Sequence, residues 1–474
     1  MRRAVALICA AMAGGGALQA QGLSKAPPRR DPAIEILVAD AAIVPPEFSS
    51  DLLIRIASLP KVDQAWRREL LDDAYMRAYG APQQYRLATN EQIPPDSRQG
   101  AEVFANVTAL TRVTLQIRVV QLMAFVDRAH ARDLFEWIDL NLAPGTCANP
   151  LVPSVDEYYT TLTLLARTAY RYRPDALNFF ELYLWRAHLP SEMPAVARSI
   201  DRFRFGAIEA AYFEGLFRLL LQGSTTDPRG FSSADLDIIS KSTELQIADT
   251  AMGVPGSNVL EAVRVYLLAQ LKAPRCADNS TAVVTPSTFN AALRRAKAEF
   301  DVKPIDENAA RLPTLLGATH IDMYWQTAEA GRLHDAAARL RGTGAVALPL
   351  RVRQTVEWRN QAEALLIDVE RWSAARESNE RDYFYQKSVL YTWLLELMPQ
   401  SVVRQRALRS FVEFLRRSET DVNQRALWFA FVNRLLEMAS GPYRAEVLAA
   451  MEESHQPTLW VYARLERQAP ERRP

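Results

Sequence analysis

The sequence predicts an all-α protein in which antiparallel helix pairs form an α-solenoid or helical-repeat array. Three observations favour this fold class. Apolar residues recur at spacings of three and four along most of the chain, which is the period of an amphipathic helix. Proline and glycine breaks divide the chain into helices of about 12–25 residues. Alternating apolar and polar runs, which are typical of strands, are almost absent.

Residues 1–20 have the layout of a secretory signal peptide. Two arginines at positions 2 and 3 precede an apolar run over 4–13, and the segment closes on small residues that end with Ala20. The apolar run is shorter than the roughly 20 residues that a membrane-spanning helix needs. We therefore expect cleavage after Ala20 and export to the periplasm or the cell exterior. Residues 21–32 are then a flexible leader.

The segment 105–140 is predicted to form the clearest helix pair, with a tight turn near Asp127. Its first helix includes the apolar stretch from Val107 to Val126, which has the length of a membrane span. Arginines at positions 112 and 118 lie inside that stretch, and charges near the middle of a helix are costly in lipid. We expect a helix buried in protein and no membrane span in the mature chain.

After the signal peptide, the cysteines that remain are Cys147 and Cys276. Each lies just past the end of a predicted helix, in a polar loop. Two loop cysteines in an oxidising compartment favour a disulfide, with two unrelated free thiols as the alternative. Neither belongs to a Cys-x-x-Cys pair, so the pattern indicates no redox or zinc site.

A second group of helix signals follows the first cysteine. Ser154 and Glu157 have the spacing of a capping box at the start of a helix. Thr285 followed by Pro286 indicates another helix start, because proline is tolerated in the first turn. Polar residues at 276–286 interrupt the helical pattern. We predict a linker there, between an N-terminal helical domain (33–275) and a C-terminal helical-repeat domain (287–474).

The segment 324–341 carries small residues at the spacing of a packed helix pair, in the runs 328–331 and 336–340. This stretch resembles a degenerate helical hairpin of the tetratricopeptide-repeat type. Between 380 and 467, helices are predicted to start about every 20 residues. The resemblance covers about a third of the chain. It implies that each pair buries its apolar face on the next pair, as in a solenoid.

One predicted helix of that region has a basic side. Arg406, Arg409, Arg416 and Arg417 lie broadly opposite its apolar residues. Such a stripe is either a solvated helix face or a surface for an anionic ligand or partner.

The composition excludes some partners. The chain of 474 residues has a formal charge of +1 with both signs intermixed. Because such a chain has no long-range field, nucleic acid is not an expected partner. The hydrophobic content of 49% is sufficient for a large core.

The search for catalytic motifs is mostly negative. The sequence has no nucleophile elbow, zinc-protease motif, phosphate-binding glycine loop or dinucleotide fingerprint. We therefore expect no cofactor and no metal. The leading hypothesis is an exported, non-enzymatic binding or scaffold protein with a protein or peptide partner.

The alternative is a secreted helical-toroid enzyme that acts on polysaccharide or cell wall. Its candidate catalytic residues are Asp156, Glu157 and Tyr159, which follow the Cys147 loop. Carboxylates beside a tyrosine are suited to general acid–base chemistry.

Overall fold

The computed structural model describes residues 30–89, 93–204, 206–229, 233–254, 258–296, 302–311, 314–342, 348–373, 379–418, 424–439 and 441–468. Within these ranges the chain forms 21 α-helices, two short 3₁₀ helices and four strands of two residues each. The predicted all-α class is confirmed. The predicted signal peptide and most of the leader lie outside the described residues.

The N-terminal part of the chain contains thirteen helices. Their bounds are α1 Pro32–Ala41, α2 Pro46–Ala57, α3 Gln64–Ala78, α4 Arg98–Asn106, α5 Arg112–Val126, α6 Arg128–Glu136, α7 Asp156–Thr168, α8 Arg173–Leu184, α9 Met193–Phe203, α10 Gly206–Gly223, α11 Ser233–Ala251, α12 Val259–Lys272 and α13 Thr281–Arg295. A 3₁₀ helix, η1, covers Pro190–Glu192.

The C-terminal part contains the other eight helices. Their bounds are α14 Ala328–Arg341, α15 Leu350–Arg353, α16 Val356–Arg371, α17 Glu380–Leu397, α18 Val402–Ser418, α19 Arg425–Met438, α20 Arg444–Glu453 and α21 Pro457–Gln468. The second 3₁₀ helix, η2, covers Ala309–Arg311.

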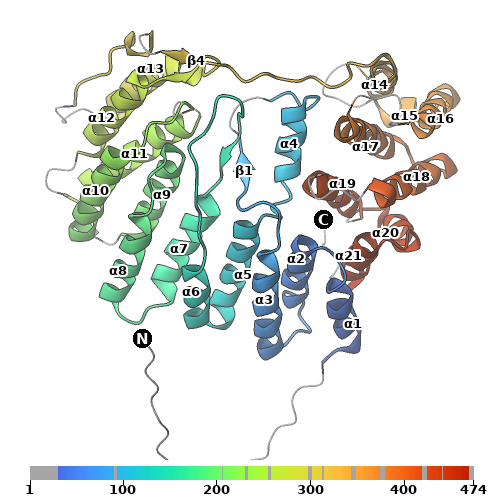
Figure 1. Cartoon of the computed structure of the whole chain (residues 1–474), viewed down its shortest axis with the longest axis horizontal. Coiled ribbons are helices and arrows are strands. Elements are labelled where there is room, and N and C mark those ends of the chain that lie inside the picture. The colour runs from blue at the N-terminus through green and yellow to red at the C-terminus, as the bar shows by residue number, and fades with distance from the viewer. Residues whose placement is uncertain are drawn as a thin grey trace, which may run out of the picture.

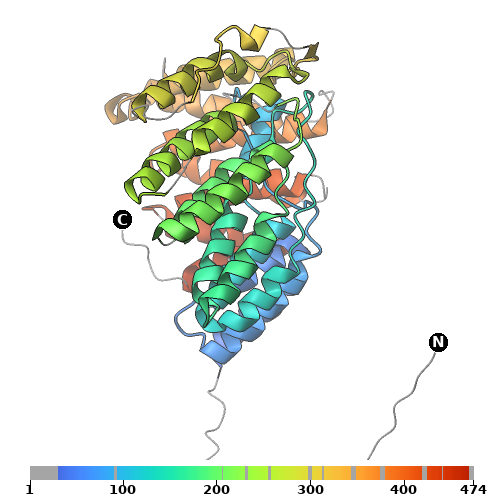
Figure 2. The same cartoon turned by 90° about the vertical axis from the view of Figure 1, so that its left-hand side faces the viewer.

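The helices form an arc of two rows (Figures 1 and 2). Helix contacts define an inner row in the spatial order α14, α17, α19, α21, α2, α5, α7, α9, α11 and α13. The outer row contains α16, α18, α20, α1, α3, α6, α8, α10 and α12 (Figure 1). Helix α4 lies inside the arc and packs on α19. The predicted array of antiparallel pairs is therefore present, with an additional helix on its concave side.

Asp127 shows how the sequence makes one of these pairs. It ends α5, and its side chain accepts a hydrogen bond from the backbone N–H of His130 in the first turn of α6. This is the N-cap interaction for which aspartate is well suited. The predicted turn at Asp127 is confirmed, and α5 is buried against its neighbours on most sides. Among the described helices, none combines the length and apolar character that crossing a membrane requires.

The first and last described helices meet in the middle of the arc, where α21 packs on α1 and α2. Phe48 of α2 contacts Phe429 of α19, and Phe429 contacts Tyr462 of α21, with ring centroids 5.1 and 4.9 Å apart. The buried carboxylate of Asp51 accepts a hydrogen bond of 2.7 Å from the Tyr462 hydroxyl. We call this contact between α21 and the first two helices the terminal seam. Because of it, the C-terminal helices and the N-terminal helices form one continuous array.

An extended segment connects the two free ends of the arc (Figure 1). This segment, which we call the strap, comprises residues 302–311 and 314–327. Strand β4 of the strap (Leu315–Leu316) pairs in parallel with β3 (Arg275–Cys276). Further along, the backbone N–H of Tyr324 donates to the carbonyl of Asp96, just before α4. The other two strands, β1 (Leu87–Ala88) and β2 (Val152–Pro153), pair antiparallel.

Two local predictions are wrong. Ser154 and Glu157 do not form a capping box, because α7 begins at Asp156 with Val155 as its N-cap. The backbone N–H of Ser154 instead donates to the carbonyl of Arg86, which holds this residue beside the β1–β2 pair.

The second error concerns the start of α13. This helix begins at Thr281, so Pro286 lies inside it, and helix covers the second half of the predicted 276–286 linker. The Thr285 hydroxyl donates to the carbonyl of Thr281 within this added turn.

Candidate functional site

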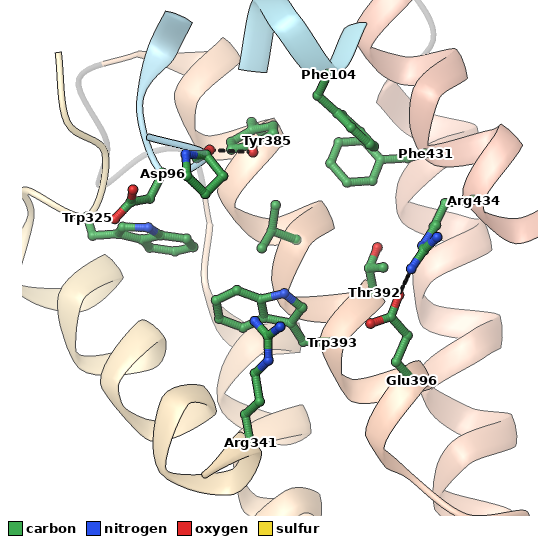
Figure 3. Close-up of a pocket in the computed structure, with 12 residues that line it drawn as sticks. Asp96, Phe104, Trp325, Arg341, Tyr385, Thr392, Trp393, Glu396, Phe431 and Arg434 are labelled. Carbon is green, nitrogen blue, oxygen red and sulfur yellow. Dashed lines mark hydrogen bonds and ion pairs between the residues drawn. The ribbon is translucent and has the colours of Figure 1, made fainter. Parts of the chain in front are cut away.

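A pocket with aromatic walls lies on the concave side of the array, where α4 and the strap approach the inner row (Figure 3). Its volume is about 390 Å³. Helix α17 supplies most of the floor, and α4, α14, α19 and the strap supply the walls. The lining residues are Pro95, Asp96, Phe104, Trp325, Arg341, Tyr385, Val389, Thr392, Trp393, Glu396, Phe431 and Arg434.

The upper wall is a cluster of packed rings. Phe104 of α4 lies against Phe431 of α19, with ring centroids 5.0 Å apart. Tyr385 of α17 packs between Phe104 and Tyr324 and donates a hydrogen bond of 2.6 Å from its hydroxyl to the carbonyl of Pro95. Burial raises the pKa of Tyr385 to about 12, so its hydroxyl remains a donor at neutral pH. These contacts pack the rings of this wall against one another.

The opposite wall is built from two tryptophans. Trp325 of the strap lies 4.6 Å from the ring of His334, and His334 lies 5.6 Å from the ring of Trp393 on α17. Trp325 has a positive φ of 62°, a conformation that costs free energy for a bulky residue. The packing around Trp325 therefore offsets the cost of this backbone conformation and keeps the ring at the edge of the pocket.

The charges of the pocket are arranged unevenly. Arg434 forms ion pairs with Glu396 at 2.5 Å and with Glu437 at 2.6 Å. The guanidinium of Arg341 lies 5.3 Å from the centroid of the Trp393 ring, on which it stacks as a cation. Among the described residues, no carboxylate lies within ion-pair distance of Arg341. Asp96 lies on a different side of the pocket, beside Trp325 (Figure 3).

This arrangement is suited to binding an apolar or ring-shaped group. Flat aromatic faces offer a large contact area, and the nearby charges offer oriented polar contacts. Of the two lining carboxylates, Glu396 is neutralised by Arg434, so the pocket does not present a pair of free acids. Nowhere in the described ranges do three or more histidine, cysteine or acidic side chains gather in a way that could hold a metal ion.

The candidate catalytic residues of the alternative hypothesis do not surround one cavity. Asp156 and Glu157 are exposed on the first turn of α7, where Asp156 pairs with Arg198 and Glu157 lies 3.8 Å from Arg86. Tyr159 is buried, and its hydroxyl donates to Glu192 at 2.7 Å. Burial raises the pKa of the Tyr159 hydroxyl well above its usual value.

Tyr159 and Glu192 do line a separate cavity of about 500 Å³, together with His188. One carboxylate oxygen of Glu192 accepts hydrogen bonds from Tyr159, and the other accepts from the backbone N–H groups of His188 and Leu189, each at 2.9 Å. Both oxygens of this carboxylate are therefore hydrogen-bonded, and they stabilise the loop before η1.

The predicted basic stripe on α18 is largely neutralised. Arg406 pairs with Glu370, and Arg416 and Arg417 both pair with Glu413. Hydrogen bonds from these two arginines lower the pKa of Glu413 to about 2, and the bond from Arg416 has the larger effect. Arg409 is exposed. A solvated helix face accounts for this arrangement.

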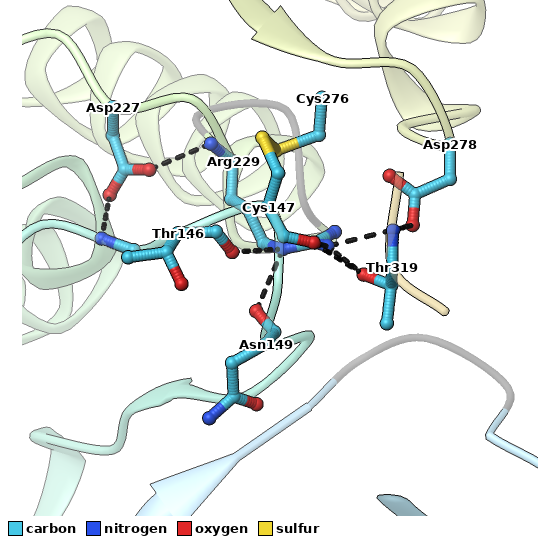
Figure 4. Close-up of a disulfide and its surroundings, with 9 residues drawn as sticks. Thr146, Cys147, Asn149, Asp227, Arg229, Cys276, Asp278 and Thr319 are labelled. Atoms are coloured by element: carbon cyan, nitrogen blue, oxygen red, sulfur yellow. Dashed lines mark hydrogen bonds and ion pairs between the residues drawn. A yellow bond between two sulfur atoms is a disulfide. The ribbon is translucent and has the colours of Figure 1, made fainter. Parts of the chain in front are cut away.

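The predicted disulfide between Cys147 and Cys276 is present (Figure 4). Beside it, the fully buried guanidinium of Arg229 donates to the carbonyls of Thr146, Asn149 and Cys147 at 2.8–3.0 Å. The Thr319 hydroxyl of the strap also donates to the carbonyl of Cys147. We call this contact between two loops and the strap the disulfide junction.

The residues of the aromatic pocket were not identified from the sequence. They come from four segments that lie between positions 95 and 434, so no linear motif connects them. The local signal was a density of aromatic residues at 324–325 and 383–393. In a helical protein, such density more often indicates core.

Comparisons of the chain with protein-family models, with characterised proteins and with solved structures found no match. The function of the pocket must therefore be inferred from its own residues.

Proposed function

We propose that this chain is an exported, non-catalytic binding protein that holds a peptide or protein segment on the concave side of its helical array. The aromatic pocket would anchor one apolar side chain of that segment. The observation that carries the proposal is the convergence of rings from α4, the strap, α17 and α19 on one open space (Figure 3).

The dimensions of the site support a side-chain anchor. A volume of about 390 Å³ lies in the range of small-ligand pockets, about 300–1,000 Å³, and exceeds that of a single aromatic side chain. Aromatic walls of this kind concentrate binding energy in a few contacts. From the pocket, the inner row of helices continues through α21 and α2 to α13, and it provides a long surface for the remainder of an extended segment.

The chemistry of the site favours binding over catalysis. A glycan hydrolase of the usual kind needs two carboxyl groups placed on either side of the scissile bond. In the pocket, Glu396 is paired with Arg434 at 2.5 Å. On α7, Asp156 is paired with Arg198, and Tyr159 is buried away from Glu157.

The test is selection of a random peptide library displayed on phage against the mature chain with its disulfide intact. We expect enriched peptides that share an aromatic or large aliphatic residue. Their affinity should fall by about tenfold or more for Trp393→Ala, because a central aromatic contact is lost. Trp137→Ala is the matched control, since Trp137 is 72% exposed and lies outside the pocket. A second variant, Val389→Trp, fills the pocket and leaves both of its tryptophans in place.

Two results would overturn the proposal. One is enrichment of peptides that bind both pocket variants as tightly as the unchanged protein. The other is release of reducing sugar ends from cell-wall polysaccharide by the purified protein, with loss of that activity in Asp156→Ala or Glu157→Ala, which would establish the enzymatic alternative.

A further inference from the structure

Arg341 is the feature of the aromatic pocket that the proposed function leaves unused. It is the last residue of α14, it is exposed, and its guanidinium lies against the Trp393 ring at the pocket edge (Figure 3). The other arginine of the pocket, Arg434, already contacts two carboxylates. Within the described part of the chain, Arg341 has no carboxylate partner. The pocket therefore presents one uncompensated guanidinium beside an apolar space.

We propose that the pocket recognises a carboxylate that lies next to an apolar side chain, with Arg341 as the partner of the carboxylate. This inference rests on the proposed function and specifies the chemistry of its ligand. A guanidinium presents a planar fork of donors that matches the two oxygens of a carboxylate. Stacking on Trp393 restricts the motion of this fork, so less side-chain entropy is lost when it binds.

The other charges of the pocket give such a ligand an orientation. Glu396 is neutralised by Arg434, so it does not compete for Arg341. Asp96 lies beside Trp325, on a different side of the pocket from Arg341, and would repel a carboxylate placed there (Figure 3). A negative group is thus attracted to the Trp393 edge, and its apolar neighbour is directed between the aromatic walls.

The carboxylate could come from the free C-terminus of a peptide or from an acidic side chain within it. Three fluorescein-labelled hexapeptide pools distinguish these sources. Each pool has phenylalanine at the last position, and the positions before it are random neutral residues except for one aspartate in the third pool. The first pool ends in a free acid, the second ends in an amide, and the third ends in an amide with aspartate before the phenylalanine.

We expect the first or the third pool to bind about tenfold more tightly than the second in fluorescence polarisation, because a charge-assisted contact is added. Arg341→Gln should abolish that difference. The matched control is Arg339→Gln, which changes an exposed arginine of the same helix that does not line the pocket. Arg341→Lys should retain part of the preference, because the charge remains and the planar fork is lost.

The failure of this inference differs from that of the proposed function. If all three pools bind equally, and Arg341→Gln binds as the unchanged protein does, the carboxylate preference is wrong and the aromatic pocket still binds peptides. If no pool binds and phage selection also yields nothing that depends on Trp393, the proposed function itself is wrong.

Discussion

The terminal seam and the disulfide junction both join segments that are far apart in the sequence, but they do so by different means. At the seam, Asp51 and Tyr462 are 411 positions apart and meet through a buried hydrogen bond. At the junction, Cys147 and Cys276 are 129 positions apart and are joined covalently. The seam connects helices of the array to each other, and the junction fastens the strap that runs between its free ends.

The comparison teaches that the two contacts respond to different conditions. The seam depends on the charge state of Asp51, whose side chain is 1% exposed and which pairs with Arg55 at 2.8 Å and with Arg118 at 2.7 Å. Burial by itself would raise the pKa of Asp51, but the two guanidinium groups and the Tyr462 hydroxyl hold it below its ordinary value of 3.8. The junction instead depends on the redox state of two sulfur atoms.

We expect the largest loss of stability when the seam is disrupted by Asp51→Ala. This change removes the shared partner of two arginines and a tyrosine. It leaves the buried Tyr462 hydroxyl and the half-buried Arg118 guanidinium without that partner, and it leaves Arg55 with the longer contact to Glu466 at 3.8 Å. We expect a loss of about 3–5 kcal/mol in the free energy of unfolding, measured by urea denaturation at pH 7. Asp156→Ala is the matched control, because it removes an exposed carboxylate with an arginine partner and should cost less than about 1 kcal/mol.

The pH dependence of Asp51→Ala provides a second measurement. Because its folded pKa is lowered, Asp51 contributes stability that is present above pH 3.8 and is lost as the pH falls through its folded pKa. The difference between the unchanged protein and Asp51→Ala should therefore shrink in acid. A constant difference from pH 7 down to pH 3 would contradict the role given to the charge.

We expect the second largest loss of stability when the junction is disrupted by Cys147→Ser and Cys276→Ser together. Removing a disulfide that closes a long loop costs about 2–5 kcal/mol, chiefly because the unfolded chain regains entropy. We also expect the strap to lose protection in hydrogen exchange before α2 and α21 do. The same result should follow from adding a reductant to the unchanged protein and should be absent when the reductant is added to the double variant. Equal loss of protection at the seam and at the strap would contradict the separation of the two contacts.

The sequence predicted the disulfide of the junction and not the seam, for a physical reason. A disulfide needs two cysteines in an oxidising compartment, and residue type together with loop position identifies them. The seam needs a buried carboxylate, and nothing local marks Asp51 within its amphipathic helix. Its partners Arg118 and Tyr462 belong to other helices. The apolar periodicity predicted these helices but could not predict which helices pack against each other.

The same limit applies to the aromatic pocket. The helical period predicted α17 and α19, but their packing against α4 and the strap decides that Trp393 lines an open space. Remote partners also left the two interpretations of the basic stripe open in the sequence. Arg406 was a candidate for an anionic surface, and its neutralising partner Glu370 lies 36 positions earlier, on another helix.

The smallest expected change in stability concerns a second buried carboxylate of the seam. It tests how charges contribute to the stability of this contact. Glu47 of α2 is 2% exposed and lies 3.4 Å from Arg425 of α19. Burial raises the pKa of Glu47 above its ordinary value of 4.5, and the attraction of Arg425 does not offset this. Within one seam, the two acids therefore have pKa values shifted in opposite directions.

Glu47→Gln tests this opposition. Because the folded pKa of Glu47 is raised, its contribution to stability is fully present below pH 4.5 and is lost as the pH rises through that folded pKa. The substitution should stabilise the protein by about 0.5–2 kcal/mol at pH 7 and by less at pH 4, in urea denaturation at both values. Destabilisation that is larger at pH 7 than at pH 4 would mean that the ion pair with Arg425 outweighs burial. In that case the ionised carboxylates of both Glu47 and Asp51 would stabilise the seam, and Asp51 would not differ from Glu47 in this respect.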